Sequence, residues 1–224
     1  MITLYELAGE QGVNFSPYCW RTRMALQHKG LPFTTVDVGF TEIDEASQGL
    51  FHTLPFIHDD HNRRIGGSFE IAEYLENAYP DTPSLFSSQQ GKTLALFFER
   101  WARTLHTDIA RIAIFDIFNK LKARDKAYFR ASREKALGDS LENVQSNCQS
   151  ASTAQLTDKL QLLEQHLKDL PFVGGEAPLY ADYIVYGTLK WLFTVSENVK
   201  LTHLGPHIQA WYLQLDSKHS SNET

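Results

Sequence analysis

The stretch SPYCWRTR, residues 16–23, holds the side chains best suited to chemistry. Thiol redox enzymes place two cysteines at this spacing, but here Ser16 stands in the attacking position and only Cys19 is kept. Ser16 followed by Pro17 is typical of a helix start. Because a helix N-terminus favours an anion, the Ser16 hydroxyl could both cap the helix and stabilise the thiolate of a bound ligand. A plain N-cap serine is the alternative that the spacing leaves open.

Cys19 is interpreted differently. Its spacing from Thr22 and Leu26 places it on the inner face of the predicted helix, where a small core residue is favoured over a catalytic thiol. Without a partner at position 16 it cannot form the internal disulfide of a dithiol enzyme. His58 and His61 have a metal-like spacing, but they lie on a predicted hairpin tip without a third ligand, so no metal site is expected.

The elements that would position Ser16 alternate between strand and helix in the first third of the chain. Strands are predicted at 2–7, 33–37, 55–58 and 64–65, and helices at 16–29, weakly at 41–53, and from Ser68 onward. This order, β-α-β-α-β-β-α, is that of a thioredoxin-like domain. We therefore expect an α/β thioredoxin-like domain over residues 1–79.

Strand signals stop after a linker predicted at 80–92, which is rich in proline and polar residues. Residues 93–224 are predicted to form an all-α domain, with helices at 93–121, 125–144, 153–169, 180–195 and 205–216. The polar, nearly uncharged stretch SLENVQSNCQSASTAQ is interpreted as a frayed helix end or a loop. The chain thus divides into a small α/β domain and an all-α domain.

Composition narrows the classes of partner. The 224 residues carry a formal net charge of −6 with 42% hydrophobic and 21% charged residues, and no Lys/Arg stripe is present, which argues against nucleic acid. No window approaches a membrane-spanning length, and the first residues lack the pattern of a signal peptide. Two cysteines suit a reducing compartment, so a cytoplasmic protein is expected.

Several motifs in order resemble the glutathione transferase superfamily over nearly the whole chain. They are most similar to the branch that holds the bacterial lignin β-aryl etherases and the fungal class A transferases. The motifs are SPYCWRTR (16–23), LPFI (54–57), Ser68, IAEYL (71–75), YPD (79–81), SREK (132–135), LENVQ (141–145) and ADY (181–183). The resemblance implies a homodimer, glutathione as co-substrate on the first domain, and a site for a hydrophobic aromatic molecule between the domains.

The resemblance also implies roles for single residues. Ser16 would activate the glutathione thiol. The Leu54-Pro55 bond would be cis and expose main-chain groups to the ligand, whereas a trans proline at a strand start is the alternative. Ser68 would cap its helix and hold the γ-glutamyl carboxylate, or be a simple cap. The residues assigned to glutathione are Ser16, His52, Thr53, Leu54, Pro55, Gly67 and Ser68.

Two positions depart from the family pattern. Gly67 stands where relatives usually have an acidic residue that holds the ligand's amino group, and Thr53, next to His52, stands where they often have Lys, Arg or Gln. Tyr18, Trp101 and Phe115 are assigned to the aromatic substrate, although the helical aromatic stripe is more typical of core and dimer contacts, and Tyr18 of a surface aromatic. Asp182 matches a helix-capping box whose usual first residue is replaced by Leu179.

The sequence therefore predicts a glutathione transferase whose thiolate, formed at Ser16, attacks an electrophilic aromatic compound, including a β-aryl ether. The alternative from another class is a non-catalytic carrier of hydrophobic aromatics on the same fold, which Gly67 and Thr53 favour. A redox enzyme that uses Cys19 is a third and weaker hypothesis.

Overall fold

The computed structural model describes residues 1–220 of the chain. Its N-terminal half is a four-stranded mixed sheet in the order β2-β1-β3-β4, in which β1 and β2 are parallel and the other pairs antiparallel. The strands are β1 (Ile2–Leu7), β2 (Phe33–Val38), β3 (Phe56–His58) and β4 (Arg64–Gly66), and the helices are η1 (Glu10–Gly12), α1 (Pro17–His28), η2 (Phe40–Glu42), α2 (Ile43–Ser47) and α3 (Ser68–Ala78). The predicted thioredoxin-like order is confirmed.

Local signals explain the two longer helices of this half. Helix α1 begins after Ser16, whose side chain accepts a hydrogen bond from the Cys19 N–H, and the chain leaves the helix through Gly30 at a φ of 64°. Helix α3 buries Ile71, Ala72 and Leu75 completely. These residues fall on one face of the helix, as its sequence pattern predicts.

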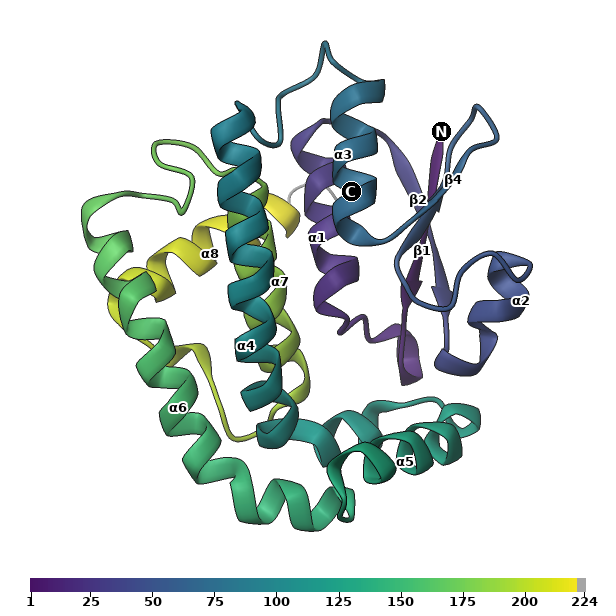
Figure 1. Cartoon of the computed structure of the whole chain (residues 1–224), viewed down its shortest axis with the longest axis vertical. Coiled ribbons are helices and arrows are strands. Elements are labelled where there is room, and N and C mark those ends of the chain that lie inside the picture. Colours follow the sequence, from purple (N-terminus) through teal and green to yellow (C-terminus); the bar gives the residue numbers. More distant parts are fainter. Residues whose placement is uncertain (221–224) are drawn as a thin grey trace.

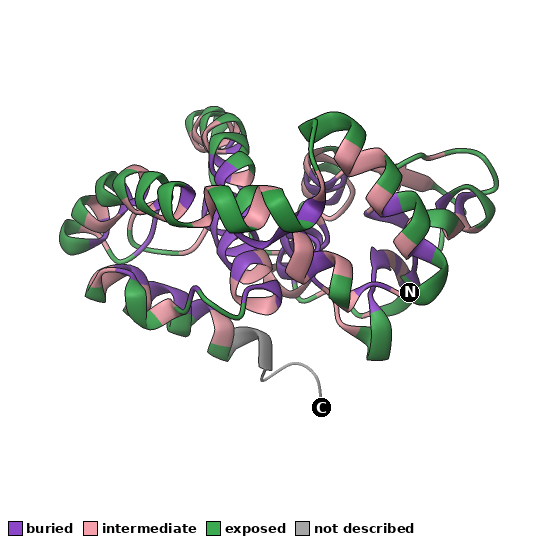
Figure 2. Ribbon diagram, turned by 90° about the horizontal axis from the view of Figure 1, so that it is seen from below, coloured by how far each residue is buried: buried purple, intermediate pink, exposed green. Residues whose placement is uncertain are grey.

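The second half is entirely helical among the described residues (Figure 1). It consists of α4 (Gln89–Lys120), α5 (Ala123–Leu137), α6 (Leu141–Asp169), α7 (Tyr180–Val195), η3 (Leu201–His203) and α8 (Pro206–Ser220). Helix α4 packs against both α6 and α7, α7 is mostly buried, and buried residues concentrate where the helices meet (Figure 2). Helix α5 runs beneath the N-terminal half and packs on η2 (Figure 1).

The interpretation of the polar stretch at 140–155 was wrong, because it forms part of the continuous 29-residue helix α6. Helix α4 is kinked at Ala113, which has φ −137° and ψ 19°. An uninterrupted helix would pair the Asp116 N–H with the Ile112 C=O. Instead the Asp116 N–H donates to the Gln145 side chain at 3.2 Å, and the Gln149 side chain donates to the Ile112 C=O at 3.0 Å. The polar residues of α6 thus satisfy the broken backbone of α4.

The two halves share one interior. The fully buried Tyr180 on α7 donates its hydroxyl to the Ser68 C=O at 2.6 Å, and the fully buried Arg21 on α1 pairs with Glu99 on α4. The predicted linker falls between α3 and α4, although α4 begins four residues early, at Gln89 rather than at residue 93. The domain boundaries themselves stay a prediction, and the predicted end at 221–224 lies outside the described residues.

Candidate functional site

A cavity of about 900 Å³ lies between the two halves. Its N-terminal wall contains the start of α1, residues 52–54 and residues 67–70, and its helical wall contains residues of α4, α5 and α7. The volume is near the upper end of the range for small-molecule sites. Of the residues predicted from sequence, the cavity brings together Ser16, Tyr18, His52, Thr53, Leu54, Gly67 and Ser68.

Ser16 lies at the N-terminus of α1 and lines this cavity. Its Oγ accepts a hydrogen bond from the Cys19 N–H at 3.3 Å, and only 6% of the residue is exposed. The N-terminus of a helix carries unpaired N–H groups and a partial positive charge. The local arrangement therefore favours an anion beside the Ser16 hydroxyl.

Cys19 belongs to the buried core, as predicted, with 1% of its surface exposed. Burial raises the pKa of its thiol to about 12, against the opposing hydrogen bonds from Ser16 and from the Leu7 N–H. A thiol with this pKa is protonated at neutral pH, and the thiol is not a nucleophile. The redox hypothesis for Cys19 is therefore unsupported by the geometry.

The Leu54-Pro55 peptide bond is cis, as predicted. Leu54 lines the cavity together with His52 and Thr53, whereas Pro55 is buried behind them and its C=O accepts a hydrogen bond from the Gly67 N–H at 3.0 Å. Among the described residues, neither the N–H nor the C=O of Leu54 has a partner. Two main-chain groups, one donor and one acceptor, are therefore available at the cavity wall.

The start of α3 differs from the prediction, because Gly67 rather than Ser68 occupies the N-cap position. Gly67 has a φ of 87°, a conformation that glycine adopts without strain, and no side chain caps the helix. Ser68 is the first helical residue and is 6% exposed. Both residues line the cavity, so the helix N-terminus still opens onto it.

Glu70 is a cavity residue that sequence reasoning missed. Its carboxylate folds back over the start of α3, so that a Cβ atom at Gly67 would lie 2.2 Å from Glu70 Oε2. Glu70 forms no ion pair with the described residues. The carboxylate thus occupies the space that a side chain at position 67 would take. The signal was present in the sequence, since Glu70 is three residues after the N-cap, where capping-box acids occur.

The cavity-facing side of α4 carries a mixed stripe at helical spacing. It consists of Leu96, Glu99, Arg103, His106, Ala110, Ile114 and Ile117. Trp101 and Phe115 lie on other faces of α4 and do not line the cavity, which corrects their assignment to the substrate site. Trp101 packs edge-on against Phe98, and Phe115 stacks on Phe118. The aromatic residues of α4 are packing residues. The prediction missed the cavity face of α4 because that face carries polar residues.

A neutral histidine lies at the centre of this wall. His106 Nδ1 is 3.4 Å from the Tyr18 hydroxyl, and its Nε2 is 3.0 Å from Thr188 Oγ1 and 3.4 Å from Arg21 Nη2. Burial, reinforced by the charges of Arg21 and Arg103, lowers the pKa of His106 to about 3. The imidazole therefore contributes hydrogen bonds but no positive charge near neutral pH.

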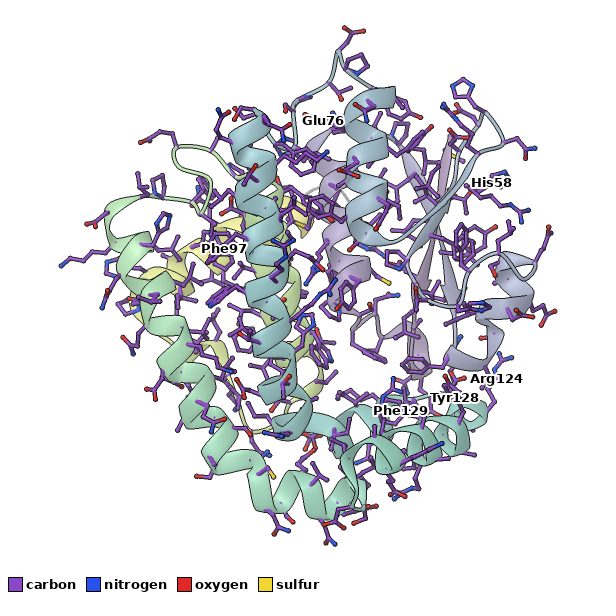
Figure 3. The ribbon with its side chains drawn as sticks, in the orientation of Figure 1. His58, Glu76, Phe97, Arg124, Tyr128 and Phe129 are labelled. Carbon is purple, nitrogen blue, oxygen red and sulfur yellow. The ribbon has the colours of Figure 1, made fainter. Side chains whose placement is uncertain are left out.

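The far end of the cavity is formed by α5 together with Phe40 and Ile43. Figure 3 shows Tyr128 and Phe129 on the side of α5 that faces the N-terminal half. Phe40 lies 6.4 Å from Tyr128 and 5.6 Å from Phe129 between ring centres. Arg133 lies beside these rings and also lines the cavity. This end combines aromatic surface with one cation.

Comparisons with known proteins agree with this architecture. Residues 15–78 match the family described as "Glutathione S-transferase, N-terminal domain", and residues 93–203 match "Glutathione S-transferase, C-terminal domain". The chain belongs to the glutathione S-transferase superfamily. It is 24% identical over 197 residues to the glutathione S-transferase-like protein ustS of Aspergillus flavus, a match that covers 76% of this chain and 71% of the relative.

Solved structures of two fungal superfamily members have the same fold. Glutathione transferase GSTFuA3 from Phanerochaete chrysosporium is 25% identical with a TM-score of 0.85, over 97% of this chain and 96% of its own. A glutathione S-transferase of Ceriporiopsis subvermispora, solved in complex with glutathione, is 23% identical with a TM-score of 0.86, over 100% and 98%.

Two further structural features bear on membranes and metals. Within residues 1–220, no helix is both long and apolar enough to cross a bilayer. The same residues contain no cluster of three or more potential metal ligands among histidine, cysteine, aspartate and glutamate.

Proposed function

We propose that the chain is a glutathione transferase, with glutathione as co-substrate and Ser16 as the catalytic residue. The observation that carries this proposal is the placement of Ser16 at the N-terminus of α1, on a cavity that is also lined by His52, Thr53, Leu54, Gly67 and Ser68. A helix N-terminus stabilises a thiolate, and the hydroxyl adds a hydrogen-bond donor to the sulfur.

Glutathione would lie along the N-terminal wall. The unpaired N–H and C=O of Leu54 suit the main chain of the cysteinyl residue. Ser68 and the N-terminus of α3 suit the γ-glutamyl carboxylate, and Glu70 supplies the carboxylate for the ammonium group in place of an acidic residue at Gly67. His52 and Thr53 would face the glycine end. These residues line one wall of the same cavity.

The reaction begins with loss of the thiol proton to solvent, which leaves the thiolate beside Ser16. The sulfur then attacks an electrophilic carbon of an aromatic compound, a C–S bond forms, and the leaving group departs with its bonding electron pair. The resemblance to the β-aryl etherases extends this to a β-aryl ether, whose C–O bond would break to release a phenolate that takes a proton from water.

Two further properties belong to the same proposal. A homodimer is supported by Phe97, which is 60% exposed and lies on the side of α4 that faces away from the N-terminal half (Figure 3). A cytoplasmic location is supported by Cys19 and Cys148, which are both free thiols. The dimer is testable by sedimentation, with Phe97→Glu expected to favour the monomer.

The decisive experiment compares Ser16→Ala with Ser88→Ala. Ser88 caps α4 in the same manner, through the Gly91 N–H at 3.1 Å, but it lies outside the cavity. With 1-chloro-2,4-dinitrobenzene as electrophile, kcat/KM should fall about 100-fold in Ser16→Ala, as for other lost donors to a reacting anion, and stay near wild type in Ser88→Ala. The pKa of bound glutathione, from the pH-rate profile, should rise toward the free value of about 8.5.

Unchanged turnover and an unchanged thiol pKa in Ser16→Ala would contradict the role of Ser16 and leave the helix N-terminus as the activator. The alternative function, a non-catalytic carrier of aromatics, is favoured by Gly67 and Thr53, since neither brings a charged side chain to the ligand. A carrier would bind aromatics but neither turn over the electrophile nor be retained on immobilised glutathione.

A further inference from the structure

Arg133 is a cavity residue that the proposed placement of glutathione on the N-terminal wall does not use. It lies on α5 and is half-buried, with its guanidinium carbon 5.0 Å from the ring centre of Phe129 and 5.8 Å from that of Phe40. Its Nη1 donates to Ser132 Oγ at 3.1 Å. The guanidinium is thus held against aromatic faces at the cavity wall.

The carboxylates of Glu134, Glu42 and Asp125 make their contacts with other groups, and Asp125 Oδ2 is buried without a hydrogen-bond partner. Glu134 pairs with Arg130, Glu42 pairs with Lys122 and Arg124, and Asp125 accepts hydrogen bonds from the N–H and hydroxyl of Thr41. Within residues 1–220, Arg133 has no ion pair. Arg103, the other arginine of the cavity wall, pairs with Glu99. Arg133 is therefore a cation whose counterion the described chain does not supply.

A neutral aromatic ligand would fit the rings but leave this charge uncompensated. A ligand that covers Phe40 and Phe129 removes water from the guanidinium, and a desolvated cation without a partner is costly. An anionic group on the ligand removes that cost, because a guanidinium binds a carboxylate through two parallel hydrogen bonds. The α5 end of the cavity then packs against the ring of the ligand and pairs with its charge.

We infer that the α5 end of the cavity binds an aromatic carboxylate, with its ring against Phe40, Tyr128 and Phe129 and its carboxylate on Arg133. This names the class of the second substrate as an aromatic acid. The inference rests on the proposed function for the reaction, in which the glutathione sulfur attacks from the Ser16 side, but the binding site itself is independent of glutathione.

The binding test uses matched probes without glutathione. Titration calorimetry compares 2-naphthoate with 2-naphthamide, which have similar shapes but differ in charge. The wild-type protein should bind the carboxylate at least about tenfold more tightly, as expected for a charge-assisted pair. Arg133→Gln should abolish this preference while leaving affinity for the amide nearly unchanged. Arg133→Lys should retain part of it, because lysine keeps the charge but not the fork of donors.

Lys135→Gln is the matched control. Lys135 is on the same helix, is exposed, and lies outside the cavity, so its replacement removes the same charge without altering the site. It should retain the wild-type preference. The wild-type comparison and Arg133→Lys also keep the inference testable if Arg133→Gln folds poorly.

The turnover test uses 4-chloro-3-nitrobenzoate and 4-chloro-3-nitrobenzamide with glutathione, where a C–S bond replaces the C–Cl bond and chloride leaves. Arg133→Gln should raise KM for the benzoate about tenfold or more and leave KM for the benzamide and for glutathione near wild type. If neither electrophile reacts while naphthoate is still preferred, the proposed function fails and the binding site stands.

Three results would overturn the inference. The wild-type protein could bind naphthoate and naphthamide equally. Arg133→Gln could weaken both probes to the same extent, which would indicate a packing role. A rise in KM for glutathione alone would assign Arg133 to the glycine carboxylate of the co-substrate instead.

Discussion

The two walls of the cavity are built from different parts of the polypeptide. The N-terminal wall offers mostly main chain, namely the N-termini of α1 and α3 and the unpaired groups of Leu54. The helical wall offers side chains, with the neutral His106 at its centre and Arg133 at its end. Main-chain groups are the same whatever the side chain, whereas a side-chain wall changes with every substitution. The main-chain wall suits a co-substrate that stays the same, whereas the side-chain wall suits a second substrate whose identity depends on those side chains.

Glu70 tests this contrast most strongly, because it is a side chain on the main-chain wall. Glu70→Gln should raise KM for glutathione about 10- to 100-fold, the value of one charge-assisted hydrogen bond. With glutaryl-cysteinyl-glycine, which lacks the amino group, wild type and variant should behave alike. Glu73→Gln, on the same helix but paired with Lys92 away from the cavity, is the control. An equal loss with both thiols would show that Glu70 does not hold the ammonium.

A substitution at Gln145 tests the helical wall through a residue of α6 that supports α4. Gln145→Leu removes the acceptor for the N–H groups of Phe115 and Asp116 and should lower the free energy of unfolding by about 2 kcal/mol. KM for the aromatic substrate should change, and KM for glutathione should not. Gln155→Leu, exposed on the same helix, is the control for urea denaturation and kinetics. A shift in both KM values would mean that the two walls are not independent.

His106 gives the smallest effect, through pH. Its folded pKa of about 3 lies below the ordinary value, so only the unfolded chain takes up a proton as pH falls below about 6.5. Stability is therefore lost on acidification, by about 1.4 kcal/mol from this group between about pH 7.5 and about pH 5.5. Urea denaturation at both pH values should show that His106→Asn lacks this part of the loss. An identical pH dependence in both proteins would mean that His106 takes up a proton in the folded protein as readily as in the unfolded chain.

The contrast also explains which parts of the protein could be predicted. The cap at Ser16 depends on a local signal and was predicted correctly from a few adjacent residues, whereas the cis Leu54-Pro55 bond was predicted correctly from the family resemblance. The N-cap of α3 was predicted at Ser68 but lies one position earlier, because the backbone at Gly67 has a positive φ and this glycine is the N-cap. The same backbone turn brings Glu70 over the cavity, which the linear spacing from Ser68 did not reveal.

The helical wall depends on contacts between distant segments, and there prediction was weaker. Trp101 and Phe115 were chosen for their aromatic character, yet the cavity face of α4 carries Arg103 and His106. Polar residues on a helix normally indicate a solvated face, and only the position of α1 opposite α4 makes them part of a site. Likewise α6 was divided in the prediction, because nothing local shows that Gln145 has a broken helix to satisfy.

The kink in α4 has a consequence for how substrate preference can be changed. The bend at Ala113 sets the direction of the segment of α4 that carries Ile114 and Ile117 into the cavity, and the side chains of Gln145 and Gln149 on α6 hydrogen-bond to the backbone of α4 at this bend. Altering Gln149 would therefore resize the cavity without changing any atom that a ligand touches. A mutant library confined to the cavity lining would leave the angle of this bend unsampled, although the bend directs the part of the α4 wall that follows Ala113.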